Sequence, residues 1–350
     1  MKYKIVNINS SGNQSILIIY TGGTFGMVRD EDGALTPFNF GKVVECIPVL
    51  KNLDIKLTVI SFPIPIDSSN VGIQDWKSMA HIIEENYTQY DGFVILHGTD
   101  TMAYSSSMLS YMLKGLNKPV IFTGAQIPIG SLRSDARENL IGALELASAE
   151  QEGIPKISEV GLYFNHKLLR GNRSQKLRSS TFAAFDSENY PALAEVGINI
   201  AFNHSALKKH DAKANLNVST ALNPNISLLK LFPGIPKHLA VAILSDSKTK
   251  GVVLETFGSG NTMKFEWFIK ALKEGIGQGK YILNVSQCVG GEVQQGKYET
   301  SKMLNEIGVL SGNNITTEAA VMKMMFVLGT QTDKDKIRKM LVSSIAGEMD

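Results

Sequence analysis

The chain has 350 residues, 43% of them hydrophobic and 19% charged, and its formal net charge is +2. Because single hydrophobic cores seldom exceed about 250–300 residues, this length predicts two domains. The nearly balanced charge, without lysine and arginine blocks interleaved with aromatic residues, argues against nucleic acid as a partner. No stretch reaches the roughly 20 apolar residues of a membrane helix, and residues 1–15 lack a signal-peptide core. A soluble cytoplasmic protein without a membrane partner is expected.

Short apolar segments alternate with helical patterns through the first 190 residues. Apolar runs of this kind are typical of strands buried on both faces, which predicts a parallel sheet covered by helices. In the second helix, Met108 and Met112 lie on a methionine-rich face that we interpret as core packing, and Gly115 fits the helix end. The expected strands are 16–20, 57–62, 93–96, 119–123 and 160–164, and the expected helices are 74–87, 101–116 and 135–149.

Residues 203–226 differ from the rest, because they are polar, poor in aromatic side chains and without a clear period. We interpret them as a linker. Alternating strand and helix patterns resume at residue 227. The predicted fold class is α/β, with a larger N-terminal domain (1–202) that has an open, mostly parallel sheet flanked by helices. A smaller C-terminal α/β domain (227–350) follows the linker.

Residues able to carry chemistry gather in the turns that follow four of the predicted strands. In open α/β sheets, ligands bind beyond the carboxyl ends of the strands. These turns are rich in hydroxyls, carboxylates and glycines, and four such turns that share one edge indicate a site. The turns are TGGT (21–24), PIDSSN (65–70), HGTDT (97–101) and GAQ (124–126).

Other kinds of site fit the sequence poorly. A Rossmann turn needs glycines spaced as G-x-G-x-x-G and a P-loop needs a lysine before serine or threonine, and neither follows the strand 16–20. His97 with Asp100 suggests a metal ligand pair, but no second histidine or cysteine supports it, so no metal is expected. Cys46 and Cys288 are too few for a disulfide framework and are expected to be buried thiols.

On these residues alone, two interpretations of the turns stay open. A threonine hydroxyl needs a nearby base to act as a nucleophile, and backbone N–H groups at a glycine-rich turn stabilise the oxyanion. Thr24, beside the glycines 22–23, suits that role. Thr99 equally suits a helix N-cap, Asp100 a partner of the helix dipole, and His97 a structural position. A buried lysine would serve as the base, but the pattern does not choose one.

Taken together, these motifs resemble the L-asparaginase family. YTGGTFGM and DGFVILHGTDTMAYSSSML look like its two signature motifs, and the whole pattern is most similar to the bacterial cytoplasmic, type I branch. The resemblance covers nearly the full chain. The segments that carry it are 20–27, 65–70, 91–109, 123–140, 163–176 and 257–261.

The resemblance implies a catalytic role for four residues. Thr24 corresponds to the nucleophile that attacks the side-chain amide. Thr99, Asp100 and Lys176 correspond to a second set, which activates the hydroxyl or the deacylating water. The region of Gly98 and Thr99 would supply oxyanion donors.

The resemblance also implies how substrate is held and how the protein assembles. Asp67, Ser68 and Ser69 resemble the segment that binds the α-carboxylate and α-amino groups of L-asparagine. Family members form dimers or tetramers and use no metal or organic cofactor. In such an assembly, Asn261 would reach a neighbour's site.

Two departures from the family pattern stand out. Members usually place a tyrosine on the mobile segment after the nucleophile, whereas residues 26–38 contain none. Some type I members also carry an allosteric asparagine site. The threonine that precedes the lysine in those members is Gln175 here, and an arginine of the second domain aligns near Glu255, which argues against such a site.

The leading hypothesis is therefore hydrolysis of L-asparagine to L-aspartate and ammonia through an acyl-threonine. The enzymatic alternatives are the asparaginase-like subunit of a tRNA-dependent amidotransferase and a glutaminase-asparaginase. The amidotransferase subunit normally carries an extra N-terminal domain, and only 15 residues precede the first strand here. A third hypothesis is an amino-acid-binding or regulatory protein that kept the fold, and the joint presence of Thr24, Thr99, Asp100 and Lys176 argues against it.

Overall fold

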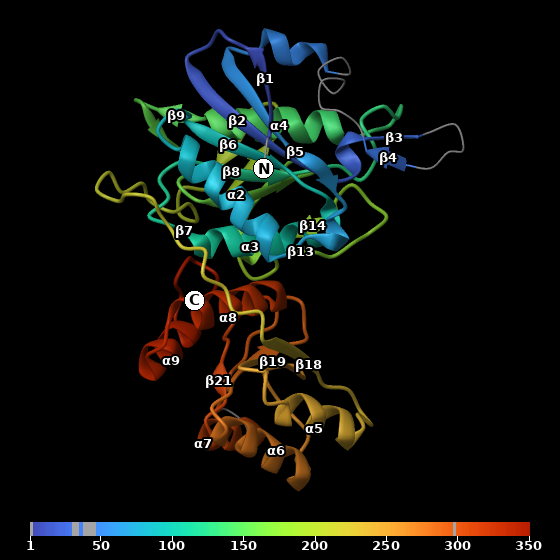
Figure 1. Ribbon diagram of the computed structural model, residues 1–350, viewed down its shortest axis with the longest axis vertical. Helices are drawn as coiled ribbons and strands as arrows, with labels where there is room; N and C mark the ends of the chain where they lie inside the picture. Colours follow the sequence, from blue (N-terminus) through green and yellow to red (C-terminus); the bar gives the residue numbers. More distant parts are fainter. Residues whose placement is uncertain (1–2, 30–34, 38–46, 297–298) are drawn as a thin grey trace. The chain divides into compact units, whose positions relative to one another are not determined.

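The computed structural model describes residues 3–29, 35–37, 47–296 and 299–350 of the chain. The chain divides into two compact units, Met1–Val218 and Ser219–Asp350. The boundary lies inside the range 203–226 that the sequence suggests as a linker. Each unit has its own sheet (Figure 1). Each also has its own hydrophobic core.

The first unit is built on a sheet that has nine strands among the described residues. Its central strands β5, β2, β6, β8 and β11 run parallel, and the strands outside them pair antiparallel. This confirms the α/β class. In order across the sheet the strands are β1 (Lys4–Asn9), β5 (Ile55–Ile66), β2 (Gln14–Gly22), β6 (Gly92–Leu96), β8 (Val120–Thr123), β11 (Val160–Phe164), β12 (Lys167–Arg170), β15 (Ala194–Val196) and β16 (Ile200–Phe202).

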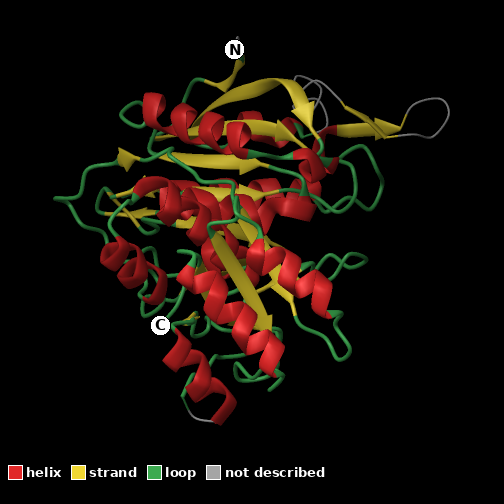
Figure 2. Cartoon of the chain, turned by 60° about the horizontal axis from the view of Figure 1, so that its bottom comes forward, coloured by secondary structure: helices red, strands yellow, loops and turns green. Residues whose placement is uncertain are grey.

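Helices cover both faces of this sheet, as Figure 2 shows. Successive side chains of a strand point to opposite faces, so Ile16 and Ile18 of β2 join one core cluster with Leu140 of helix α4. Leu17 is fully buried on the other face. A continuous apolar strand is the expected result of burial on both sides. The helices are α2 (Ile73–Asn86), α3 (Met102–Met112) and α4 (Ala136–Ser148).

Helix α3 ends earlier than the sequence pattern predicts. It stops at Met112, and the next two residues form the short strand β7 (Leu113–Lys114), which pairs with β17 (Asn217–Val218). Gly115 has φ +71°, and a Cβ atom there would lie 2.2 Å from the carbonyl oxygen of Asn215. The close approach of a distant segment therefore ends the helix, which local periodicity does not reveal. The methionine-rich face is buried, as predicted.

The first unit also contains short two-stranded ladders. They pair β3 with β4, β9 with β10, and β13 with β14. The last of these ladders matters for the candidate site, because it carries Lys176. The bounds are β3 (Met27–Arg29), β4 (Leu35–Pro37), β9 (Glu150–Gln151), β10 (Ile154–Pro155), β13 (Gln175–Lys176) and β14 (Phe185–Asp186).

The second unit has a parallel sheet of its own. Its strands follow in the order β18, β19, β20 and β21, with helices α5 and α6 supplying the apolar side chains Leu244, Phe268 and Leu272 to one core cluster. Cys288 follows β20 and is exposed, so the expectation of a buried thiol is wrong there; Cys46 lies outside the described residues. The elements are β18 (Ile226–Lys230), α5 (Lys237–Ser245), β19 (Gly251–Thr256), α6 (Glu266–Gly277), β20 (Tyr281–Ser286), α7 (Glu299–Ile307), β21 (Leu310–Ser311), α8 (Thr317–Thr330) and α9 (Lys334–Val342).

Candidate active site

Three turns meet beyond the carboxyl ends of β2, β5 and β6, and glycine makes the meeting sterically feasible. Gly23 has φ +82°, and a Cβ atom there would lie 2.4 Å from the Cα atom of Gly98. A Cβ atom at Gly98 would lie 2.5 Å from Ser68 Oγ. Real Cβ atoms essentially never come so close to other heavy atoms, so these glycines let the turns that carry Thr24, Ser68 and Thr99 pack against one another.

Thr24 begins a short 3₁₀ helix, Thr24–Gly26, directly after the glycine pair. Gly23 N donates a hydrogen bond to Ile66 O at 3.1 Å, which ties this turn to the end of β5. The Thr24 residue is partly exposed. The segment 26–38, which lacks the family's tyrosine, lies partly outside the described residues, since 30–34 and 38 are not described.

Lys176 joins Thr99 and Asp100. Its Nζ donates to Thr99 Oγ1 and to Asp100 Oδ1, each at 2.7 Å. The lysine side chain is 17% exposed, whereas that of Asp100 is 64% exposed. Strand β13 holds Lys176 in place by pairing with β14, where Lys176 lies opposite Phe185. The structure thus brings together the threonine, carboxylate and lysine that the resemblance assigned to one set.

The Thr99 hydroxyl is used differently from a helix N-cap. Thr99 starts the 3₁₀ helix Thr99–Thr101, whose N-cap residue is Gly98. Its Oγ1 donates to Gln126 Oε1 at 3.2 Å and accepts from Lys176. The sequence left open whether Thr99 is a helix N-cap or a residue of the site, and these contacts favour the second interpretation.

The segment Asp67–Ser69 forms the third part of the cluster. Asp67 Oδ1 accepts hydrogen bonds from Ser69 N at 3.0 Å and from Ser69 Oγ at 2.6 Å. Both bonds lower the pKa of the exposed Asp67 carboxyl, and the bond from the Ser69 side chain has the larger effect. Ser68 is buried, and its carbonyl accepts from Thr101 Oγ1 at 2.7 Å. The segment is thus anchored to the turn that carries Thr99.

His97 is a structural residue in this geometry. Trp76 Nε1 donates to Ser105 Oγ at 2.9 Å, so the Ser105 hydroxyl is left to donate to His97 Nε2, also at 2.9 Å. His97 Nδ1 then carries the proton and donates to Gly98 O at 2.7 Å. Burial lowers the pKa of His97 to about 4, which keeps the ring neutral. This chain of bonds fixes the peptide group that precedes Thr99.

Gln126 is the contributor whose role the sequence did not reveal. It follows β8 in one of the four turns noted above, and its amide lies between Thr99 and the segment 179–181. Gln126 also lines a cavity of about 540 Å³, together with Arg133 and Phe182. Its place in a turn after a strand is a signal in the sequence, but its partners depend on tertiary contacts.

Asn261 belongs to the second unit. It closes the turn after β19, where the backbones of Phe257 and Asn261 exchange two hydrogen bonds of 2.9 Å. Glu255, which the resemblance sets near an arginine of the allosteric members, is buried and accepts from Thr317 Oγ1 at 2.6 Å.

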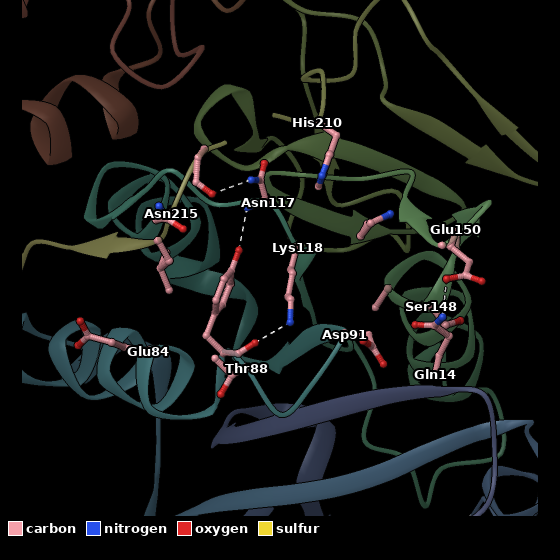
Figure 3. A pocket seen from close by; sticks show the side chains of 17 residues that line it. Gln14, Glu84, Thr88, Asp91, Asn117, Lys118, Ser148, Glu150, His210 and Asn215 are labelled. Carbon is pink, nitrogen blue, oxygen red and sulfur yellow. Dashed lines mark hydrogen bonds between the residues drawn. The ribbon is translucent and has the colours of Figure 1, made fainter. Parts of the chain in front are cut away.

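A second cavity, of about 590 Å³, lies at the other end of the first unit's parallel strands. Figure 3 shows the side chains that line it. Gln14, Asp91 and Lys118 line it at the amino ends of β2, β6 and β8. Lys118 Nζ donates to the carbonyls of Tyr87 at 2.6 Å and Tyr90 at 2.7 Å, and burial lowers its pKa. None of the residues that the sequence predicts for the site is among those lining it.

Two features are absent from the part of the chain that the structure describes. The described residues contain no group of three or more histidine, cysteine, aspartate or glutamate side chains arranged to hold a metal ion. No helix among them combines the length and apolar character needed to cross a membrane.

Comparison with known protein families decides the relationship. Residues 15–208 match the model of the N-terminal asparaginase domain, and residues 225–341 match that of the glutaminase/asparaginase C-terminal domain. The chain belongs to the asparaginase family. The turns that carry Thr24 and Thr99 both lie within the range that matches the N-terminal domain.

Three similar proteins illustrate the range of this family. L-asparaginase 1 of Escherichia coli K12 is 37% identical over 96% of this chain and 98% of its own. The crystal structure of L-asparaginase I from Vibrio cholerae superposes with a TM-score of 0.89 at 36% identity, covering 97% of this chain and all of the other. The 60 kDa lysophospholipase of Mus musculus is 39% identical over 95% of this chain. The chain spans only 62% of that relative's length.

Proposed function

We propose that this protein hydrolyses L-asparagine to L-aspartate and ammonia. The observation that carries the proposal is the position of Lys176, whose Nζ lies 2.7 Å from both Thr99 Oγ1 and Asp100 Oδ1. The packing of Gly23 against Gly98 sets this group beside the turn of Thr24. Full-length similarity to proteins named L-asparaginase supports the same activity.

In the proposed mechanism, Thr24 is the nucleophile. Its oxygen attacks the carbon of the side-chain amide, its proton passes to the leaving nitrogen, and ammonia departs from an aspartyl ester. Water then attacks the ester carbon, and its proton passes through Thr99 to a neutral Lys176, while Asp100 stabilises the resulting ammonium. The ester oxygen takes a proton back and regenerates the Thr24 hydroxyl. Splitting one difficult step into two in this way is the general advantage of covalent catalysis.

The turn at Gly98 and Thr99 is proposed to stabilise the oxyanion. His97 holds the Gly98 carbonyl at 2.7 Å. In a trans peptide the following N–H points the opposite way, so the Thr99 N–H is directed away from His97. A donor held in this way needs no reorganisation when charge develops on the substrate oxygen.

Substrate recognition is assigned to Asp67, Ser68 and Ser69, which would hold the α-amino and α-carboxylate groups. The depressed pKa of Asp67 keeps its carboxylate charged, as binding of an ammonium requires. Because both ends of the substrate are fixed, one extra methylene displaces the reacting carbon, and a misplacement of about 1 Å costs roughly a hundredfold in rate. L-asparagine is therefore the preferred substrate over L-glutamine.

The proposal extends to assembly and location. We place the protein in the cytoplasm as a homodimer or homotetramer that needs no metal or organic cofactor and has a small molecule as its partner. The resemblance to the type I branch supports this. In the assembly, Asn261 of one copy is proposed to reach the site of another.

The test is release of ammonia by the pure full-length chain. Incubated with L-asparagine, it is expected to release ammonia and L-aspartate in equal amounts. Its kcat/KM for L-glutamine is expected to be at least about a hundredfold lower than its kcat/KM for L-asparagine. Comparable values for both amides would identify a glutaminase-asparaginase. Fatty-acid release from lysophosphatidylcholine without ammonia release would overturn the proposal in favour of the activity for which the mouse relative is named. Activity only with a partner protein and tRNA would indicate an amidotransferase subunit.

A further inference from the structure

The amide of Gln126 is clamped in one orientation. Its Nε2 donates to Ser179 O and to Thr181 O, both at 3.1 Å, and its Oε1 accepts from Thr99 Oγ1 at 3.2 Å. Two carbonyl acceptors on one side require the nitrogen to face them, so the oxygen faces Thr99. The arrangement of partners thus settles which end of the amide meets the hydroxyl.

The backbone of Gln126 is fixed as well. Gln126 N donates to both carboxylate oxygens of Asp135, at 3.1 and 3.0 Å, and Ile127 N donates to the same group at 3.0 Å. Asp135 directly precedes helix α4 and also accepts from Asn139 Nδ2 at 3.1 Å. A rigid helix therefore supports the turn that presents the Gln126 side chain.

These contacts leave a single place for the Thr99 proton. A lysine ammonium has donors and no acceptor, so Thr99 Oγ1 accepts from Lys176 Nζ. The one proton of the Thr99 hydroxyl must then lie toward Gln126 Oε1. When Lys176 is neutral, its lone pair competes for that same proton.

We propose that Gln126 is a positioning residue that sets the direction of the Thr99 proton. It holds the proton away from Lys176 while the lysine is charged, which leaves the Thr99 oxygen free to accept from the ammonium. The inference rests on the proposed function, in which Thr99 and Lys176 exchange a proton. Gln126 thereby joins Thr99 and Lys176 as a third residue. The carbonyls of Ser179 and Thr181 influence the pair because they orient the Gln126 amide.

Two variants separate this role from simple support of the fold. Gln126→Met and Gln126→Glu both remove the donors to Ser179 and Thr181, but only Glu keeps an acceptor for Thr99. Gln126→Met is expected to lower kcat about fivefold to tenfold, the value of one neutral hydrogen bond, with KM within about twofold of wild type. Gln89→Met, on an exposed glutamine, is the control and is expected to change neither.

The deciding readout is the pH profile of kcat. Without the acceptor, the charged form of Lys176 loses support, so the acid limb is expected to move to lower pH in Gln126→Met. The added negative charge of Gln126→Glu favours the ammonium, and the acid limb is expected to move to higher pH. Shifts in the same direction, or none in either variant, would show that Gln126 only supports the segment 179–181.

A measurement without turnover keeps this inference separate from the proposed function. NMR titration of isotope-labelled Lys176 in the folded full-length chain is expected to show the same two opposite displacements. If the wild-type chain releases no ammonia from L-asparagine, the proposed function fails, while opposite displacements in the titration still support the role of Gln126. Equal displacements in an active enzyme refute the role of Gln126 and leave the function standing.

Discussion

The amino ends and the carboxyl ends of the central parallel strands, here called the amino edge and the carboxyl edge, differ in the contacts of their polar side chains. At the amino edge, the cavity of about 590 Å³ holds Lys118, whose ammonium is engaged by the carbonyls of Tyr87 and Tyr90 near the end of helix α2. At the carboxyl edge, Lys176 contacts a threonine hydroxyl and a carboxylate that is 64% exposed. The first lysine stabilises a helix end, whereas the second contacts groups that we propose take part in the reaction.

In the proposed function, the reaction takes place away from the cavity of about 590 Å³, so cavity volume alone does not identify the site. What distinguishes the carboxyl edge is the convergence of three turns through Gly23 and Gly98, which brings hydroxyls, a carboxylate and a lysine together. The parallel topology explains the location, because the strands of such a sheet direct their following turns to the same edge.

Replacement of Thr24 by alanine is expected to have the largest effect. Loss of a nucleophile costs several orders of magnitude, so kcat of Thr24→Ala should fall about 10⁴-fold or more while the circular dichroism spectrum stays native. Thr88→Ala, at an exposed threonine lining the amino-edge cavity, is the matched control and should keep full turnover. If Thr24→Ala retained a tenth of the wild-type turnover, Thr24 would not be the nucleophile of the wild-type protein.

The second experiment asks whether Thr99 and Lys176 act as one group. Thr99→Val and Lys176→Met should each lower kcat about a hundredfold to a thousandfold, and the double variant should lose little more than either single one. Non-additivity of this kind is expected when each side chain works only through the other. Losses that multiply in the double variant would mean that the two residues contribute independently.

The third experiment probes the glycine contact. Gly23→Ala sets a Cβ atom 2.4 Å from Gly98 Cα, so the turn must shift, and kcat should fall about a hundredfold. Gly153→Ala at the amino edge is the control, because Gly153 also has positive φ, +76°, but has no atom within 4 Å of an added Cβ. It should cost about 1–2 kcal/mol of stability and leave kcat unchanged. Equal kcat values for the two variants would show that the turns can meet without a glycine at position 23.

The smallest effect concerns stability and pH. The pKa of His97 falls from 6.5 to about 4 on folding, chiefly because the ring is buried, although the nearby Asp75 charge opposes this. Between these values the unfolded chain binds more protons, so stability falls as the pH is lowered from about 6.5 to 4, by up to about 1.4 kcal/mol per pH unit. Urea titrations should show that His97→Gln loses this part of the pH dependence. An unchanged dependence would mean that His97 does not titrate in this range.

Much of the fold was predictable from residue patterns, since buried parallel strands read as continuous apolar runs such as residues 16–20. The end of α3 was not, because the pairing of Leu113 and Lys114 with residues 217–218 overrides the helical period. The sequence also placed Thr24 and Thr99 at one edge, from the turns they occupy.

Other parts of the site lay beyond pattern analysis. Lys176 has no periodic signal, as it sits on a strand of two residues, and it was assigned only through the family resemblance. Gln126 lies in a turn that the sequence marks, but its role depends on carbonyls of Ser179 and Thr181 that only the folded chain brings near. Contacts between distant segments carry information that local spacing does not.

The most direct test of the account is to locate the covalent intermediate. L-aspartic acid β-hydroxamate has a better leaving group than ammonia, so the acyl-enzyme should accumulate and survive an acid quench. Mass spectrometry of the digested full-length protein is expected to find an aspartyl ester on the peptide that contains Thr24, and not in Thr24→Ala. An ester on the peptide that contains Thr99 would contradict the central claim.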